Sequence, residues 1–104
     1  MGDEQRLAHI REAIAEIEAY LSGADRAVFL DNSMMRFATI KQPEMIGEAA
    51  KSVTPETREQ YPRVPWQQIA GLRNVLVHEY FGVDVHIIWE IATLDIPELK
   101  KALF

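Results

Sequence analysis

The chain has 104 residues, of which 48% are hydrophobic, and this size and composition predict one globular domain with a single core. Its net charge of −5 argues against a protein that coats nucleic acid, because phosphate contacts require many lysines and arginines. The absence of cysteine excludes disulfides and thiolate metal sites, and the apolar runs are too short to span a bilayer. The N-terminal residues lack the apolar region of a signal peptide, so we expect a soluble, cytoplasmic protein.

Residues 4–21 form the first predicted helix. Leucine and isoleucine recur at spacings of three and four, which is typical of one face of an amphipathic helix: Leu7, Ile10, Ile14, Ile17 and Leu21. We expect Asp3 to cap the start of this helix and Gly23 to cap its end.

Residues 26–53 predict a second helical stretch. Its apolar face is expected to consist of Phe29, Leu30, Met34, Phe37, Ile40, Ile46 and Ala49. Met34 and Met35 are expected to pack in the interior. Pro43 lies inside the stretch, where proline removes a backbone donor and clashes with the preceding turn. We therefore predict a kink or short break near Lys41 and Gln42.

Prolines mark the next elements of the chain. Thr54 followed by Pro55 predicts a short helix from residue 55 to about residue 60, which Pro62 ends. Pro65 begins a longer helix, which Gly82 ends. The residues expected to face inward from this longer helix are Trp66, Ile69, Leu72, Leu76 and Phe81.

Asp84 is expected to cap a helix over residues 85–94, and Pro97 to begin a last short helix. Residues 83–91 are rich in β-branched side chains, which are also common in strands. No segment shows the alternation of a strand over a useful length. The sequence therefore predicts an all-α bundle of four to five helices with short loops, over a single domain of residues 1–104.

One stretch of the longer helix, "RNVLVHEY" at residues 73–80, combines apolar residues with groups that could perform chemistry. Asn74 and His78 are four residues apart and nearly aligned on a helix, whereas Arg73 is offset from His78 by roughly 140°. The helix dipole favours a charged imidazole near the C-terminus, which suits proton transfer near neutral pH. An arginine offers a planar fork of donors to a phosphate. From spacing alone, solvated or structurally bonded side chains remain the simpler interpretation, with Tyr80 as an interface or core aromatic.

Other polar and aromatic residues are expected to have structural roles: His9, His86, Trp66 and Trp89. The two histidines lack a second ligand at metal-binding spacing, so no metal site is predicted. Glu48 either pairs with Arg73 across the bundle or forms a solvated pair with Lys51 on its own helix.

The order of these residues changes their interpretation. The run "RNVLVHEY" matches the pattern R-N-x-x-x-H-x-Y and resembles the HepT-like toxins of the HEPN superfamily, small all-α proteins encoded beside a minimal nucleotidyltransferase. The runs "IGEAAK", "VPWQQIAGLRNVLVHEYFGVD" and "IIWEIATLDIPELKKAL" resemble blocks of that family in the same order. The resemblance covers almost the whole chain, and the run over residues 64–84 is its most specific part.

This resemblance implies the toxin of a toxin–antitoxin pair, a metal-independent endoribonuclease that needs no cofactor. Two copies would form a homodimer with both R-x-x-x-x-H motifs in one cleft. The attacking group would be the 2′-hydroxyl of the RNA. His78 would transfer the proton, Arg73 would stabilise the charge on the phosphorane, and Asn74 would position one of them.

The family's partner is a minimal nucleotidyltransferase antitoxin, which would inactivate the toxin by transferring AMP to Tyr80. The alternative is a non-catalytic HEPN module that binds a nucleotidyltransferase and presents a substrate or nucleotide to it. RNA cleavage by the purified protein would distinguish the two.

Overall fold

The structure is a computed structural model that describes residues 2–78 and 84–104, with backbone alone over residues 73–78. Within these ranges all regular secondary structure is helical, which confirms the predicted all-α fold. The elements are α1 (Asp3–Leu21), α2 (Arg26–Asp31), α3 (Ser33–Lys51), α4 (Pro55–Gln60), α5 (Trp66–His78), α6 (Val85–Glu90), the π-helical turn η1 (Ile91–Asp95) and α7 (Ile96–Leu103).

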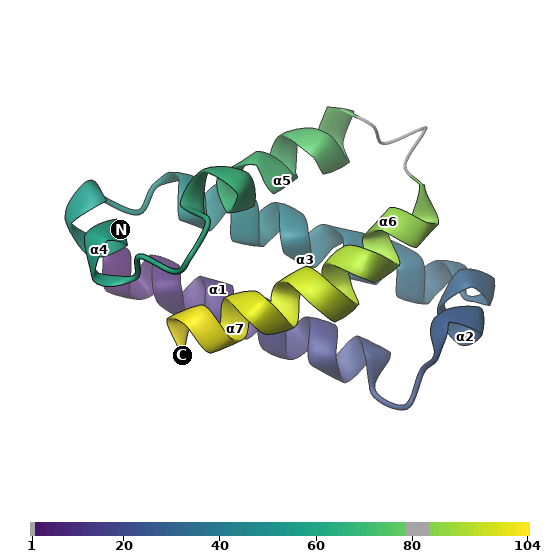
Figure 1. Ribbon diagram of the computed structural model, residues 1–104. Helices are drawn as coiled ribbons and strands as arrows, with labels where there is room; N and C mark the ends of the chain where they lie inside the picture. The colour runs from purple at the N-terminus through teal and green to yellow at the C-terminus, as the bar shows by residue number, and fades with distance from the viewer. Residues whose placement is uncertain (1, 79–83) are drawn as a thin grey trace.

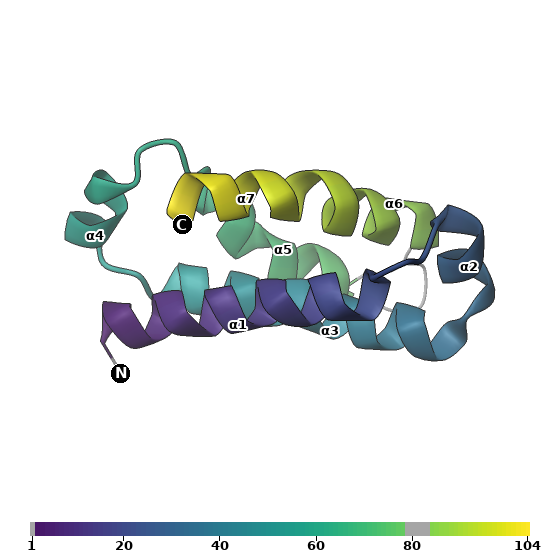
Figure 2. The same ribbon diagram turned by 90° about the horizontal axis from the view of Figure 1, so that it is seen from below.

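The longer helices form two layers. Figure 2 shows α1 and α3 in one layer and the continuous run from α6 to α7 in the other. Helix α5 begins on the side of α7 and crosses toward α3. Among the described elements, α3 and α5 form the most extensive contact between two helices. Both termini and α4 lie at one end of the bundle, and α2 lies at the other end (Figure 1).

Helix α1 supplies one wall of the main core. Ile10, Ile14 and Ile17 are buried, which confirms the predicted apolar stripe. Gly23 has a positive φ of 73°, as expected for a glycine just beyond a helix end. The expected cap at Asp3 is wrong: Asp3 is the first helical residue, and its carboxylate bonds elsewhere.

The second helical stretch breaks at Asn32, not near Lys41 and Gln42 as predicted. The Asn32 side chain accepts a hydrogen bond from the Met35 backbone nitrogen and so caps α3, which separates it from α2. Pro43 lies inside α3 and is fully buried, while the helix continues past it. Packing of α3 against α1 and α5 outweighs the cost of about 3 kcal/mol that an internal proline carries.

The break also changes which side of α3 is buried. The buried residues of this helix are Thr39, Pro43, Ile46, Gly47 and Ala50. The predicted inward positions of Met34 and Phe37 are wrong, because 80% and 60% of these residues' surface is exposed. Met35 does pack against the small cluster around Phe29.

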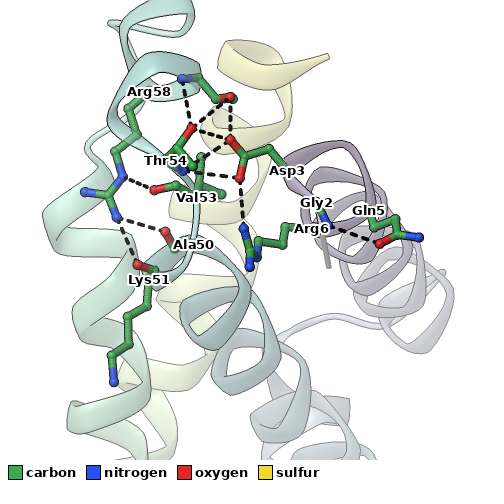
Figure 3. A network of polar contacts seen from close by, with 10 residues as sticks. Gly2, Asp3, Gln5, Arg6, Ala50, Lys51, Val53, Thr54 and Arg58 are labelled. Carbon is green, nitrogen blue, oxygen red and sulfur yellow. Dashed lines mark hydrogen bonds and ion pairs between the residues drawn. The ribbon is translucent and has the colours of Figure 1, made fainter.

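A polar network at one end of the bundle fixes α4 between α1 and α3 (Figure 3). The Asp3 carboxylate accepts bonds from the Thr54 backbone nitrogen at 3.2 Å and from the Thr57 hydroxyl at 2.6 Å. The Thr54 side chain caps α4, as predicted. The Arg58 guanidinium donates to the Ala50 carbonyl near the end of α3 at 3.0 Å. This network holds α4, and so fixes the position from which the chain continues to α5.

The chain remains helical from α6 through to α7. The Asp84 side chain caps α6 by accepting from the His86 backbone nitrogen at 2.8 Å, which confirms that prediction. The last helix begins at Ile96, one residue before the expected start at Pro97, and η1 joins it to α6 without a loop. Because Pro97 cannot donate a backbone bond, the wider turn before it, with a bond from Ile96 to the Ile91 carbonyl, lets the helix continue.

Candidate functional site

The predicted motif lies on helix α5, and its first turn is firmly anchored. Trp66 and Ile69 are buried, with 8% and 5% of their surface exposed. The Trp66 indole nitrogen donates to the Tyr61 carbonyl at 3.2 Å, and the Arg58 guanidinium lies 5.7 Å from the Trp66 ring centre. The network around α4 therefore sets the position from which the motif helix runs.

One side of α5 is open over its first two turns. Gln67 is exposed, and a Cβ added at Gly71 would meet no atom within 4 Å. Asn74 and His78 lie seven and eleven residues after Gln67, and so continue this open side of the helical backbone. The register thus places two of the three predicted catalytic positions in line with the open positions Gln67 and Gly71.

Arg73 occupies a different side of the same helix. It lies four residues after Ile69 and seven after Trp66, and so continues their side of the backbone. A single α5 therefore does not bring Arg73 and His78 onto one side. The side chains of residues 73–78 are outside the description, as is all of Tyr80, so their catalytic and modification roles remain predictions.

The groove between α5 and α7 lies away from the His78 side. It has a volume of about 490 Å³ and is lined by Ile69 and Leu72 of α5 and by Leu99 of α7, among others. Because Ile69 and Leu72 lie on the side of α5 opposite to Gln67, this groove does not open beside Asn74 and His78.

A contact between α2 and α6 adds polar groups at the other end of the bundle from α4. The Arg26 guanidinium lies 2.8 Å from Nδ1 of His86. Arginine can only donate, so Nδ1 is the acceptor in this contact. His86 is exposed, as expected, but it also joins two helices. Sequence reasoning missed this contact because its partners are 60 residues apart.

The remaining candidates have mostly structural roles. Trp66 belongs to the main core and Trp89 packs against Phe29, with ring centres 5.2 Å apart, as predicted. His9 is exposed. Glu48 is exposed on α3, and its pairing with Arg73 remains a prediction because the arginine side chain is outside the description.

The described part of the chain holds neither a cluster of metal ligands nor a membrane-spanning helix. No group of three or more His, Cys, Asp or Glu side chains there could hold a metal ion. None of its helices combines the length and the hydropathy needed to cross a bilayer.

A comparison with known protein families gives a match over most of the chain. A model of the family described as "Ribonuclease HepT-like" matches residues 10–103. The chain belongs to the HepT-like ribonuclease family. This confirms the predicted family and, at the level of the family, the predicted ribonuclease.

Two relatives are similar in sequence to this chain over most of their own length. A Methanocaldococcus jannaschii protein with the provisional name RNase MJ1380 is 39% identical over 95 residues, 91% of this chain and 87% of that protein. A Thermococcus cleftensis protein named "Probable ribonuclease HepT" is 39% identical over 94 residues, 90% of this chain and 86% of that protein. No solved structure matches the chain significantly.

Proposed function

We propose that this HepT-like chain is a metal-independent endoribonuclease that acts as the toxin of a toxin–antitoxin pair. The observation that carries the proposal is the R-x-x-x-x-H motif of Arg73 and His78 on α5, in a chain of a ribonuclease family. By helix register the positions of Asn74 and His78 continue the side of α5 that is open at Gln67 and Gly71, which supports access of an RNA strand to the motif.

The proposed chemistry is an internal transesterification. The RNA 2′-hydroxyl attacks the adjacent phosphorus while the bond to the 5′-oxygen breaks, which leaves a 2′,3′-cyclic phosphate and a 5′-hydroxyl. His78 removes the proton from the 2′-hydroxyl or delivers one to the leaving oxygen. Arg73 stabilises the additional negative charge on the phosphorane, and Asn74 positions one of these groups.

The helix register supports a site shared by two copies. Arg73 and His78 are offset by roughly 140° on one helix, so a nearby second α5 offers the simpler way to place a guanidinium and an imidazole on one phosphate. A small domain also gains stability when a second copy buries further apolar surface. We therefore propose that two copies of the chain form a homodimer.

The partner in the proposal is a minimal nucleotidyltransferase that transfers AMP from ATP to Tyr80. An AMP group would bring a negatively charged phosphodiester and a base to a residue only two positions after His78. Its charge would compete with the RNA phosphate for Arg73, and its bulk would obstruct the strand. Modification at this position therefore has a physical route to inhibition.

The test is cleavage of a defined RNA by the purified chain. We expect cleavage that persists in excess EDTA and yields a 2′,3′-cyclic phosphate, because the nucleophile belongs to the RNA. A substrate with a 2′-deoxy sugar at the cut site is the matched control and should remain intact. Cleavage of that substrate would exclude the 2′-hydroxyl as nucleophile. A correctly folded chain that cleaves no RNA but binds the nucleotidyltransferase would instead favour the non-catalytic module.

A further inference from the structure

The contact between Arg26 of α2 and His86 of α6 presents a guanidinium group at the surface without a described carboxylate beside it. Both residues are exposed, and Nη2 of Arg26 lies 2.8 Å from Nδ1 of His86. Among the described residues, no Asp or Glu forms an ion pair with Arg26. The contact therefore leaves the positive charge of Arg26 for an anion to bind.

Most other cations of the described ranges are already engaged. The Arg36 and Arg58 guanidinium groups donate to backbone carbonyls. Four further cations form ion pairs with carboxylates: Arg6, Lys41, Lys100 and Lys101. In a chain with a net charge of −5, Arg26 is therefore one of few described cationic groups that remain for an anionic ligand.

The imidazole of His86 restricts the guanidinium of Arg26. A mobile arginine side chain loses rotational freedom when it binds a ligand, and this loss of entropy opposes binding. The bond to Nδ1 engages Nη2 beforehand, and the other N–H groups of the guanidinium remain for a ligand. An arginine restrained in this way suits a phosphate group, whose oxygens accept from the planar fork of donors.

Two carboxylates lie next to the pair in the sequence, and both accept bonds from backbone nitrogens. Asp25 accepts from Val28 at 2.9 Å, and Asp84 accepts from His86 at 2.8 Å. Their negative charges remain nearby and weaken the attraction for an anion. The pair is therefore suited to an auxiliary contact with a ligand that is also bound elsewhere, and not to tight binding of a single phosphate.

The end of the motif helix lies within reach of the pair. Helix α5 ends at His78, and Asp84, six residues later, caps α6. Six residues of fully extended chain span about 20 Å, so the two points are no further apart than that. Figure 1 shows the end of α5 and the start of α6 in the half of the bundle that also contains α2. A single strand of several nucleotides can cover this distance.

We propose that Arg26 binds a phosphate of the RNA strand outside the scissile bond, and that His86 is a positioning residue that orients the Arg26 guanidinium. The inference rests on the proposed function, because the motif on α5 determines where the strand is cut. The ligand is single-stranded RNA of several nucleotides. A phosphate contact fixes the position of the strand and carries no sequence information, so the pair extends binding without taking part in bond cleavage.

The test is the affinity for a short single-stranded RNA with 2′-O-methyl sugars, which lack the attacking hydroxyl, measured by fluorescence anisotropy over a range of salt concentrations. Arg26→Gln should raise the Kd by about threefold to fivefold, the effect of one exposed ionic contact. The slope of log K against log salt concentration should fall in magnitude by about 0.7, the value for one phosphate contact with a single strand. Arg63→Gln is the matched control, because it removes the same charge from an exposed residue between α4 and α5, and it should retain the wild-type Kd and slope.

Two more variants test the role of His86. His86→Leu removes the acceptor, and at mildly alkaline pH, where a free imidazole is neutral, it changes no charge. It should weaken RNA binding while the salt slope stays at the wild-type value. Arg26→Lys should restore the slope without the full affinity, because an ammonium group lacks the planar fork. If Arg26→Gln and His86→Leu lowered Tm but left the Kd and the slope unchanged, the contact would only join two helices, and the proposal would be overturned.

Cleavage assays separate this inference from the proposed function. In a chain that cleaves RNA, Arg26→Gln should raise KM and leave kcat unchanged. Binding that depends on Arg26 in a wild-type chain that cleaves no RNA would support the RNA contact and refute the ribonuclease activity. Cleavage with a wild-type KM in Arg26→Gln would refute the RNA contact alone. Binding of inorganic phosphate that depends on Arg26, with no effect of the variant on RNA affinity, would assign the pair to free phosphate and also overturn the proposal.

Discussion

Replacement of Thr39 by valine should stabilise the protein. Thr39 is fully buried in α3, and in the described part of the chain its Oγ1 atom is a buried side-chain oxygen with no hydrogen-bond partner. Its backbone carbonyl also lacks the usual helical donor, because residue 43 is proline. Valine has nearly the same shape as threonine and a similar helix propensity, so the substitution mainly removes the hydroxyl.

The expected magnitude follows from the cost of burying an unpaired hydroxyl. Protein mutagenesis puts this cost at about 1–3 kcal/mol, and the methyl group that replaces the hydroxyl gains apolar burial. We expect the free energy of unfolding to rise by about 1–2 kcal/mol. For a domain of this size, each kcal/mol corresponds to a rise in Tm of about 4–8 °C.

The assay is thermal and urea unfolding, followed by circular dichroism at one fixed protein concentration. Thr93→Val is the matched control, because the Thr93 hydroxyl donates to the Trp89 carbonyl at 2.7 Å and its loss should destabilise the helix. A Thr39→Val variant that is destabilised as much as Thr93→Val would refute the reasoning, since the Thr39 hydroxyl would then have a partner in solution.

The remaining predictions concern the site and the acid response. His78→Ala or Arg73→Ala should abolish RNA cleavage without changing the circular dichroism spectrum, and a wild-type activity lost in EDTA and restored by Mg²⁺ would contradict the metal-independent mechanism. Tyr80→Phe should stay toxic beside the nucleotidyltransferase and gain no AMP by mass spectrometry, whereas an unmodified Tyr80 in neutralised wild-type toxin would leave only inhibition by binding. Hydrogen bonds, chiefly from Thr54, lower the pKa of Asp3 from 3.8 to about 2. Asp3→Asn should therefore lower Tm at pH 7. The difference in Tm between wild type and variant should shrink as pH falls from about 4 through about 2, because the hydrogen bonds that depress the pKa stabilise only the ionised carboxylate. A difference in Tm that stays constant over this range would exclude the linkage.

Part of the candidate site was predictable from the sequence alone. The motif is a local pattern on one helix, so the order of Arg73, Asn74 and His78 gives both their helical positions and the resemblance to the family. Their assembly was not predictable, because residues offset by roughly 140° on one helix meet only through other elements or another copy. The Arg26–His86 contact was not predictable either, because its partners are far apart in the chain and are brought together only by the fold.

The sequence by itself determined where most helices lie. The apolar spacing of α1, the Thr54–Pro55 start of α4 and the Asp84 cap of α6 depend on interactions within a few residues, so the chain carries them locally. The tertiary structure decided the course of α3. Packing against α1 and α5 keeps the helix intact through Pro43. A helix can bury only one side, and the neighbours of α3 select the side that contains Thr39 and leave Phe37 exposed.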